Sequence, residues 1–253
     1  IFIYIIVSIM KSVMVLKTEI STTTVEEVSN FLVNSKTKTV AICNANTLVR
    51  SYQSSKIQKK INSFDIKAPD GFPVAKASKI LYKNNQKRVD GYKVFHKTIK
   101  NGLNSNLSHY FFGSSEKIVS TMIKKLEEEY SGINIVGYKC PPIMTYEELC
   151  EKEFVDNMIN QNIDIIWVSL GFPKQEEFIY MLKKKYNINS NIVGVGAVFE
   201  WVAGTKIKAP EWIANIGFEW IFRLFQEPKR LFRRYLIDNF LFIIYFIKQY
   251  ISK

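Results

Sequence analysis

The segment 163–170, Ile-Asp-Ile-Ile-Trp-Val-Ser-Leu, is the feature that most limits the fold. Apolar residues nearly fill it, whereas a strand with one face in water would alternate apolar and polar residues. Such a strand is typical of parallel sheets, whose crossover helices cover both faces. Further strand patterns occur at 109–112, 133–138 and 191–195, with helical patterns between them at 116–130, 146–161 and 174–186. This alternation predicts right-handed β-α-β units and a Rossmann-like parallel sheet.

The first half of the chain follows the same rule less regularly. Its patterns predict strands at 39–43 and 64–68 and helices at 48–61 and 72–82. Within 87–100, the Asp-Gly pair at 90–91 is typical of a hairpin turn. The polar stretch 101–108 suggests a boundary between two halves.

We therefore expect an α/β chain of three parts. These are a smaller N-terminal α/β subdomain at 14–105, a Rossmann-like subdomain at 106–216 and an amphipathic helical tail at 217–253.

The tail mixes basic and aromatic residues between Phe218 and Arg234. Pro228 cannot continue a helix through its own N–H, so two helices meeting at a bend are predicted. Helical spacing brings Arg223, Arg230 and Arg234 near one face, and their planar guanidinium groups suit phosphate oxygens. An ordinary amphipathic helix with solvated arginines explains this stretch equally well. The apolar run 240–247 is too short to span a bilayer, for which about 20 residues are needed, and suits its interface.

The composition limits the classes of molecule that the chain is expected to bind. A net charge of +12 favours an anionic partner, such as a nucleotide, a phospholipid surface or nucleic acid. We expect no nucleic acid, because the chain has no zinc-finger spacing and no convincing helix-turn-helix or RNP pattern. The 3 cysteines lack a C-x-x-C pair and fit a reducing cytosol. The apolar segment 1–10 lacks a basic flank and a clear cleavage site, so we do not read it as a signal peptide.

Candidate site residues follow the strands, where sheets of this class bind ligands and helix N-termini offer N–H groups to phosphate. Asp70, in Pro-Asp-Gly, is a candidate general base or merely a turn aspartate. Asn44 and Asn46 follow the first strand and either orient a sugar or close an Asx turn.

Other loops are weaker signals. Gly113 and Ser114 open a helix after one strand, where a serine also serves as a helix cap. Lys174 and Gln175 offer charge and an amide to a nucleotide, although the same loop has ordinary capping chemistry. The pair Gly194 and Gly196 lacks the third glycine of the dinucleotide fingerprint, so NAD is not expected.

In combination these stretches resemble one family. The motifs that carry the resemblance are Asn-Ala-Asn at 44–46, Pro-Asp-Gly-Phe-Pro-Val at 69–74, Arg-Val-Asp-Gly at 88–91, the segments 168–176 and 193–204, Lys-Ala-Pro-Glu-Trp at 208–212 and the tail from 217 to 234. They occur in the order of the WecG/TagA/CpsF glycosyltransferases, and the resemblance runs from about 14 to 235.

The resemblance implies an inverting bacterial enzyme that moves a sugar, usually N-acetylmannosamine, from a UDP donor to a polyprenyl-diphosphate-linked sugar. The products feed wall teichoic acid, enterobacterial common antigen or capsule. It also implies a cytoplasmic protein attached peripherally to the inner face of the membrane through its tail. The chain has no Asp-x-Asp triplet for a metal, so we expect no cofactor. The oligomeric state is left open, a homo-oligomer included.

The same resemblance assigns roles by position. It makes Asp70 the catalytic base and places the tail arginines over the diphosphate. The other residues that it or the loop chemistry assigns to substrate binding are Asn44, Asn46, Arg88, Gly113, Ser114, Lys174, Gln175, Glu176, Gly196, Arg223, Arg230, Arg233 and Arg234. Asn44, Asp90 and Lys93 depart from the commoner family residues, which puts the sugar in doubt more than the reaction. The alternative is a non-catalytic basic module that binds membrane or nucleic acid.

Overall fold

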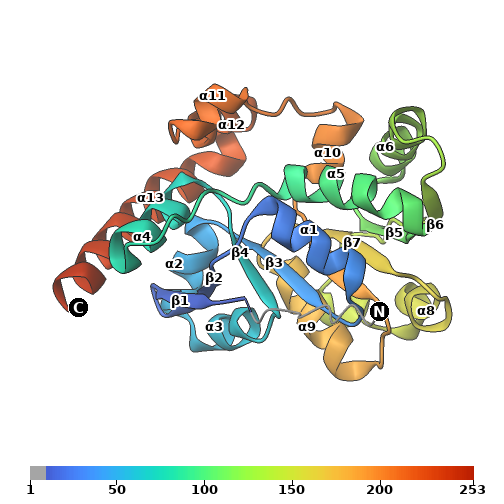
Figure 1. Ribbon diagram of the computed structural model, residues 1–253, viewed down its shortest axis with the longest axis horizontal. Coiled ribbons are helices and arrows are strands. Elements are labelled where there is room, and N and C mark those ends of the chain that lie inside the picture. The colour runs from blue at the N-terminus through green and yellow to red at the C-terminus, as the bar shows by residue number, and fades with distance from the viewer. Residues whose placement is uncertain (1–9) are drawn as a thin grey trace, which may run out of the picture.

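A parallel sheet of six strands, in the order β4-β3-β8-β7-β5-β6, forms the centre of the computed structural model (Figure 1). The structure describes residues 10–253, without the side chains of Arg233 and Arg234. Its strands are β3 (Thr39–Cys43), β4 (Ile66–Pro69), β5 (Ser108–Gly113), β6 (Asn134–Lys139), β7 (Ile165–Ser169) and β8 (Asn191–Gly194). All neighbouring strands are parallel, which confirms the predicted fold class.

Helices cover both faces of this sheet. One face carries α1 (Val25–Asn34), α5 (Gly91–Gly102), α6 (Glu116–Glu129) and α10 (Val198–Ala203). The other carries α2 (Ala45–Gln53), α3 (Ser55–Asn62), α4 (Phe72–Tyr82), α7 (Tyr146–Leu149), α8 (Lys152–Asn160) and α9 (Lys174–Lys185). Strand β7 shows why its sequence is so apolar: Ile165 and Trp167 enter one core, and Ile166 and Val168 enter the other.

Some local predictions were wrong. Residues 87–100 do not form a hairpin, because Asp90 caps α5 by accepting a hydrogen bond from the Tyr92 N–H at 2.9 Å. The helix predicted at 48–61 is two helices, since Ser54 ends α2 and caps α3. The segment 146–161 likewise divides into α7 and α8. A hairpin of β1 (Ser12–Val15) and β2 (Thr18–Ser21) was not predicted.

The three-part division stays a prediction. Strands β3 and β4 lie before the proposed boundary near 105, and β8 lies after it, yet β3 pairs with both β4 and β8 in one sheet. The halves on either side of that boundary thus share one hydrogen-bonded layer. A short 3₁₀ helix, Leu103–Ser105, occupies the boundary itself.

The C-terminal part of the chain forms α11 (Glu211–Asn215), α12 (Glu219–Gln226) and α13 (Pro228–Ile251). From here on, the tail means these three helices, so that it begins before the predicted bound at 217. Pro228 begins α13, which confirms the predicted bend between two helices. Figure 1 shows α13 as a long helix beside α2 and α4. It is fixed there by Gln249, whose amide oxygen accepts from the Leu16 N–H at 2.9 Å. Among residues 10–253, no helix combines the length and hydrophobicity needed to cross a membrane.

A candidate glycosyl-transfer site

Asp70 lies directly after β4, at the carboxyl end of the sheet. Its backbone N–H donates to the Cys43 carbonyl at 2.9 Å, which sets it beside Asn44 at the end of β3. One carboxylate oxygen, Oδ1, accepts from the Gly71 N–H at 2.8 Å and from Arg88 Nε at 3.2 Å. Gly71 has a φ of 78°, a conformation that favours glycine, and begins α4. The loop therefore holds Asp70 in a fixed orientation.

The environment of Asp70 weakens its acidity. Its side chain is 24% exposed, but the surrounding protein desolvates the carboxyl, which raises its pKa from 3.8 to about 6. The Arg88 guanidinium opposes this increase in pKa, whereas the negative charges of Asp90 and Glu219 add to it. A carboxylate with such a pKa is mostly ionised at neutral pH and is a better proton acceptor than an ordinary aspartate.

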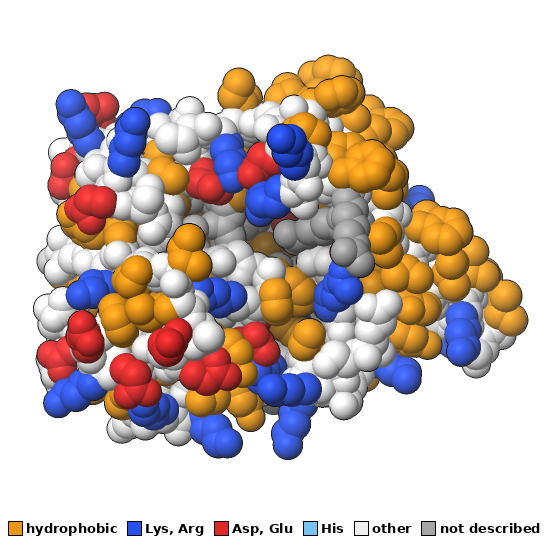
Figure 2. All heavy atoms as spheres, turned by 180° about the vertical axis from the view of Figure 1, so that it is seen from behind, with side chains coloured by type: hydrophobic (Ala, Val, Ile, Leu, Met, Phe, Trp, Pro, Cys, Tyr) orange, Lys and Arg blue, Asp and Glu red, His pale blue; other side chains and the backbone are white. Residues whose placement is uncertain are grey.

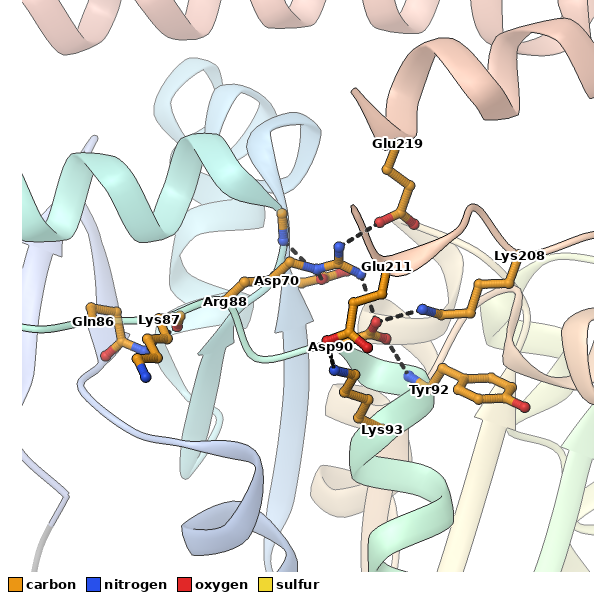
Figure 3. Close-up of polar contacts among 11 residues, drawn as sticks. Asp70, Gln86, Lys87, Arg88, Asp90, Tyr92, Lys93, Lys208, Glu211 and Glu219 are labelled. Atoms are coloured by element: carbon orange, nitrogen blue, oxygen red, sulfur yellow. Dashed lines mark hydrogen bonds and ion pairs between the residues drawn. The ribbon is translucent and has the colours of Figure 1, made fainter. Parts of the chain in front are cut away.

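Arg88 lies at the centre of a charged cluster (Figure 3). Besides Asp70, its guanidinium contacts Asp90 Oδ2 at 2.7 Å and Glu219 Oε2 at 2.7 Å. Asp90 Oδ2 also accepts from Lys208 Nζ at 2.7 Å. The cluster links the loop before α5 to the first residue of α12, so Arg88 connects Asp70 to the tail.

Two cavities meet at Asp70. The larger has a volume of about 230 Å³ and lies over the ends of β3, β7 and β8. The smaller, of about 80 Å³, lies between the Asp70 loop and the tail and reaches Asn46, Arg88, Trp220 and Tyr235. Asn44, Asp70 and Arg223 line both. A group in the larger cavity and a group in the smaller one would therefore both contact Asp70.

Most of the predicted substrate-binding residues line these cavities. The larger one includes Asn44, Ser114, Gln175, Glu176, Gly196, Arg223 and Arg230. Gly113 and Lys174 do not line either cavity. A Cβ on Gly113 would come within 2.4 Å of the Ser169 carbonyl oxygen, so this glycine permits close strand packing. Gln175 accepts from the Gly196 N–H at 3.0 Å and fixes the loop after β8.

Asn46 is held from the tail. Its side-chain amide donates to Asp238 Oδ2, and Arg50 Nη2 lies 3.1 Å from Asp238 Oδ1. Asp238 is only 1% exposed although it lies on α13. Asp238, which interrupts the apolar pattern of α13, thus helps to join this helix to α2, as does Tyr245, whose ring stacks on that of Tyr52.

The tail arginines differ in their surroundings. Arg223 stacks over the Trp201 ring at 5.2 Å and forms no ion pair with another described residue. Arg230 makes two contacts with the Glu227 carboxylate, at 2.8 and 2.5 Å. Both line the larger cavity, so guanidinium groups and Asp70 belong to the walls of the same cavity. Arg233 and Arg234 were predicted to act with them, but their side chains lie outside the described residues.

Sequence reasoning missed several residues of the site. Glu200, Trp201 and Lys206 line the larger cavity, and Glu219 and Trp220 line the smaller one. A sequence signal that could have revealed these residues is a repeated Glu-Trp pair, which occurs at 200–201, 211–212 and 219–220. Each tryptophan offers a broad apolar surface and each glutamate a charge to pair with a nearby cation.

The sequence of this chain is also similar to those of known proteins. Residues 13–253 match the family described as "Glycosyl transferase WecG/TagA/CpsF family". An "N-acetylglucosaminyldiphosphoundecaprenol N-acetyl-beta-D-mannosaminyltransferase" from Staphylococcus aureus is 27% identical over 90% of this chain and 89% of its own. Proteins of the same name from Bacillus spizizenii and Bacillus subtilis are 24% and 26% identical. These alignments cover 84% and 71% of this chain and 80% and 68% of the relatives.

Proposed function

Since the chain belongs to the WecG/TagA/CpsF family and is a glycosyl transferase, we propose that it transfers N-acetylmannosamine from a UDP donor to N-acetylglucosamine on a polyprenyl diphosphate. The product would be a precursor of teichoic acid or another cell-surface polysaccharide. The names of its relatives support this donor sugar and this acceptor. The relatives and the family do not support the alternative of a non-catalytic basic module.

The position of Asp70 between the two cavities carries this proposal. We assign the larger cavity to the UDP-sugar, because it lies at the carboxyl ends of the strands and is lined by arginines from the tail. We assign the smaller cavity to the acceptor sugar. The anomeric carbon and the acceptor hydroxyl would then meet beside Asp70.

The proposed reaction is a single displacement with inversion. The acceptor oxygen forms a bond to the anomeric carbon, while the bond from that carbon to the diphosphate oxygen of UDP breaks. Asp70 takes the proton of the attacking hydroxyl, which contributes roughly 10²–10⁴ in rate. Its raised pKa favours this transfer, and the Arg88 contact keeps the ionised form in place.

Negative charge grows on the departing UDP and requires a positive partner. Arg223 and Arg230 line the donor cavity, and one such preorganised donor is worth about 3 kcal/mol. Arg223 has no competing ion pair among the described residues, so it can contact the diphosphate without breaking one. We propose that these cations act in place of a divalent metal. The tail that carries them also covers the site and limits the access of water.

The outer surface of the tail suits attachment to a membrane. Trp212, Ile216, Phe218 and Phe225 are at least half exposed and border an apolar cavity between α11 and α12. Figure 2 shows hydrophobic side chains gathered on this side of the molecule. We propose peripheral attachment of this surface to an anionic membrane, on the cytoplasmic face where a UDP-sugar would be available.

A transfer assay tests the proposal. The protein is incubated with a panel of UDP-sugars and a short-chain polyprenyl-diphosphate N-acetylglucosamine, and products are separated by mass. We expect UDP-N-acetylmannosamine to give a disaccharide product with inverted configuration. Transfer of another sugar would correct the donor, and no transfer together with no thermal shift by UDP would overturn the proposed function.

A further inference from the structure

A third cavity, of about 570 Å³, opens beside the smaller of the two cavities at Asp70. The two share Phe72, Arg88 and Ala214, so a bound molecule could extend from one into the other. The remaining lining residues are Ala75, Lys76, Lys79, Gln86, Lys87, Lys93, Glu211 and Asn215. We call this cavity the basic groove.

The cationic groups of the basic groove are not equivalent. Lys93 is paired with Glu211, and the Arg88 guanidinium is occupied by three carboxylates (Figure 3). Lys76, Lys79 and Lys87 are exposed and have no ion pair within the described part of the chain. Three cations therefore face the same open volume without a partner.

Helix α4 places two of these lysines in line with the catalytic loop. Phe72, Lys76 and Lys79 follow each other at i, i+4 and i+7, so they lie on one helical face. Phe72 lines the smaller cavity as well. Lys76, the first of these lysines on α4, thus lies one helical turn after Phe72, which lines the cavity that the acceptor sugar would occupy.

Helix α11 separates the basic groove from the apolar surface of the tail. Glu211, Ala214 and Asn215 line the groove, whereas Trp212, Ile213 and Ile216 border the apolar cavity. The small cavity lies next to Asp70, the groove with its free lysines adjoins that cavity, and the apolar surface lies across α11 from the groove.

We propose that the basic groove binds the diphosphate of the lipid-linked acceptor, an inference that rests on the proposed function. The acceptor has the same order of groups: a hydroxyl, one sugar ring, a diphosphate and an apolar chain. Compact ammonium groups suit phosphate oxygens as point charges. Lys76, Lys79 and Lys87 therefore fix the acceptor, while Arg88 remains committed to Asp70.

Anionic lipid headgroups offer the same phosphate chemistry, so the test must separate the two sources. We choose the variant Lys76→Gln/Lys79→Gln, with Lys56→Gln/Lys59→Gln on α3 as the control. Both pairs are exposed, carry the same charge and have the same i, i+3 spacing. Neither Lys56 nor Lys59 lines the basic groove.

Kinetics are measured with UDP-N-acetylmannosamine and a water-soluble short-chain acceptor, without vesicles. We expect the KM for the acceptor to rise about tenfold in the groove variant, as two ion pairs are lost. The KM for the donor and kcat should stay within about twofold, and Lys76→Arg/Lys79→Arg should recover most of the affinity. An unchanged acceptor KM, or an equal increase in the α3 control, would overturn the proposal.

Two further arms separate the remaining outcomes. If the groove variant loses activity only when phosphatidylglycerol vesicles are present, the lysines bind lipid headgroups and the proposal is wrong. If the wild-type protein transfers no sugar and UDP gives no thermal shift, the proposed function fails, and the groove is tested by calorimetry with farnesyl diphosphate. Binding that weakens about tenfold in the groove variant but not in the control would still support a diphosphate site, and equal binding would exclude it.

Discussion

Glu219 Oε2 lies 2.7 Å from Arg88 Nη1, and Arg88 Nε lies 3.2 Å from Asp70 Oδ1. Glu219, the first residue of α12, is therefore connected to the proposed base Asp70 through a single side chain, that of Arg88. Because the same tail carries Arg223 and Arg230, its docking both completes the cation set of the donor cavity and sets the charge around Asp70. The tail and the proposed base are thus linked through the contacts of Arg88.

The first prediction concerns the pH dependence of transfer. The negative charge of Glu219 raises the pKa of Asp70, so Glu219→Gln should lower that pKa. The acid limb of kcat/KM, which reports the base of the free enzyme, should move to lower pH. The pH–rate profile is compared with that of Glu128→Gln, an exposed substitution on α6. Identical limbs in the two variants would show that the tail does not act on Asp70.

The second prediction is that Asp70→Asn greatly slows transfer while leaving UDP binding largely intact. The amide keeps the size of the side chain and can still accept from Gly71 and Arg88, but it cannot take a proton. We expect kcat to fall by roughly 10²–10⁴, with the dissociation constant of UDP changed less than about threefold. Single-turnover kinetics and calorimetry measure both. Retained turnover would remove Asp70 from its role.

The same substitution should stabilise the protein at neutral pH. The pKa of Asp70 is higher in the folded state than in the unfolded chain, so the carboxyl costs stability once the unfolded chain ionises. This cost is absent below the ordinary pKa of 3.8 and reaches its full value above about pH 6. Asp70→Asn should gain on the order of 1–3 kcal/mol at pH 7 and little at low pH. Urea unfolding at several pH values measures the difference, and a loss of stability at pH 7 would contradict it.

The third prediction tests whether Arg223 contributes to transfer more than other cations of the tail do. Arg223→Met should lower kcat by about 10², since a preorganised donor to the leaving group is lost. Lys229→Met is a matched control, because Lys229 is an exposed cation on α13 that lines neither cavity at Asp70. Equal effects of the two substitutions on kcat would indicate a general charge effect. The stability of both variants is checked by thermal unfolding.

The fourth prediction is that chelators leave transfer unchanged. If Arg223 and Arg230 neutralise the departing diphosphate, the rate in excess EDTA should stay within about twofold of the untreated rate. The assay is repeated with added Mg²⁺ and Mn²⁺. A loss of activity in EDTA that either ion restores would refute the metal-independent mechanism.

Features of the fold that depend on neighbouring residues in the sequence could be predicted, and features that depend on distant contacts could not. The parallel sheet was predictable because Ile165, Ile166, Trp167 and Val168 form an uninterrupted apolar run. The Asp-Gly pair at 90–91 led to the wrong prediction of a hairpin, since an aspartate that can begin a turn can equally cap a helix. The choice between turn and helix depended on the packing of α5 against α1. Propensity alone could not decide between them.

The site was predictable where it follows strand ends and not where it depends on the tail. Asp70 and Asn44 occupy strand ends, and the parallel pairing of β3 with β4 brings them together. The role of Asp238 could not be predicted in this way, because in the sequence it is only a polar residue that interrupts an apolar helix. Its contacts with Asn46 and Arg50 span more than 180 residues, and no local pattern reveals such pairs. The three Glu-Trp pairs similarly acquire a role only after folding.

The last prediction tests the apolar surface of the tail. Trp212 and Phe225 are 67% and 83% exposed and belong to the apolar cavity between α11 and α12. Burial of each side chain in the lipid interface would contribute roughly 1.5–3 kcal/mol. The variant Trp212→Ser/Phe225→Ser should therefore lose most of its sedimentation with phosphatidylglycerol vesicles. Its activity on a short water-soluble acceptor should remain, because neither residue lines the cavities at Asp70.

Ile143→Ser provides the control for that experiment, since Ile143 is fully exposed, lies before α7 and does not border the apolar cavity between α11 and α12. If exposed apolar area alone drove binding, this substitution would also weaken sedimentation. We expect it to have no effect, because attachment needs several apolar side chains together with nearby cations on one surface. Equal sedimentation of the tail variant and the control would show that the surface of α11 and α12 does not attach the protein to membranes.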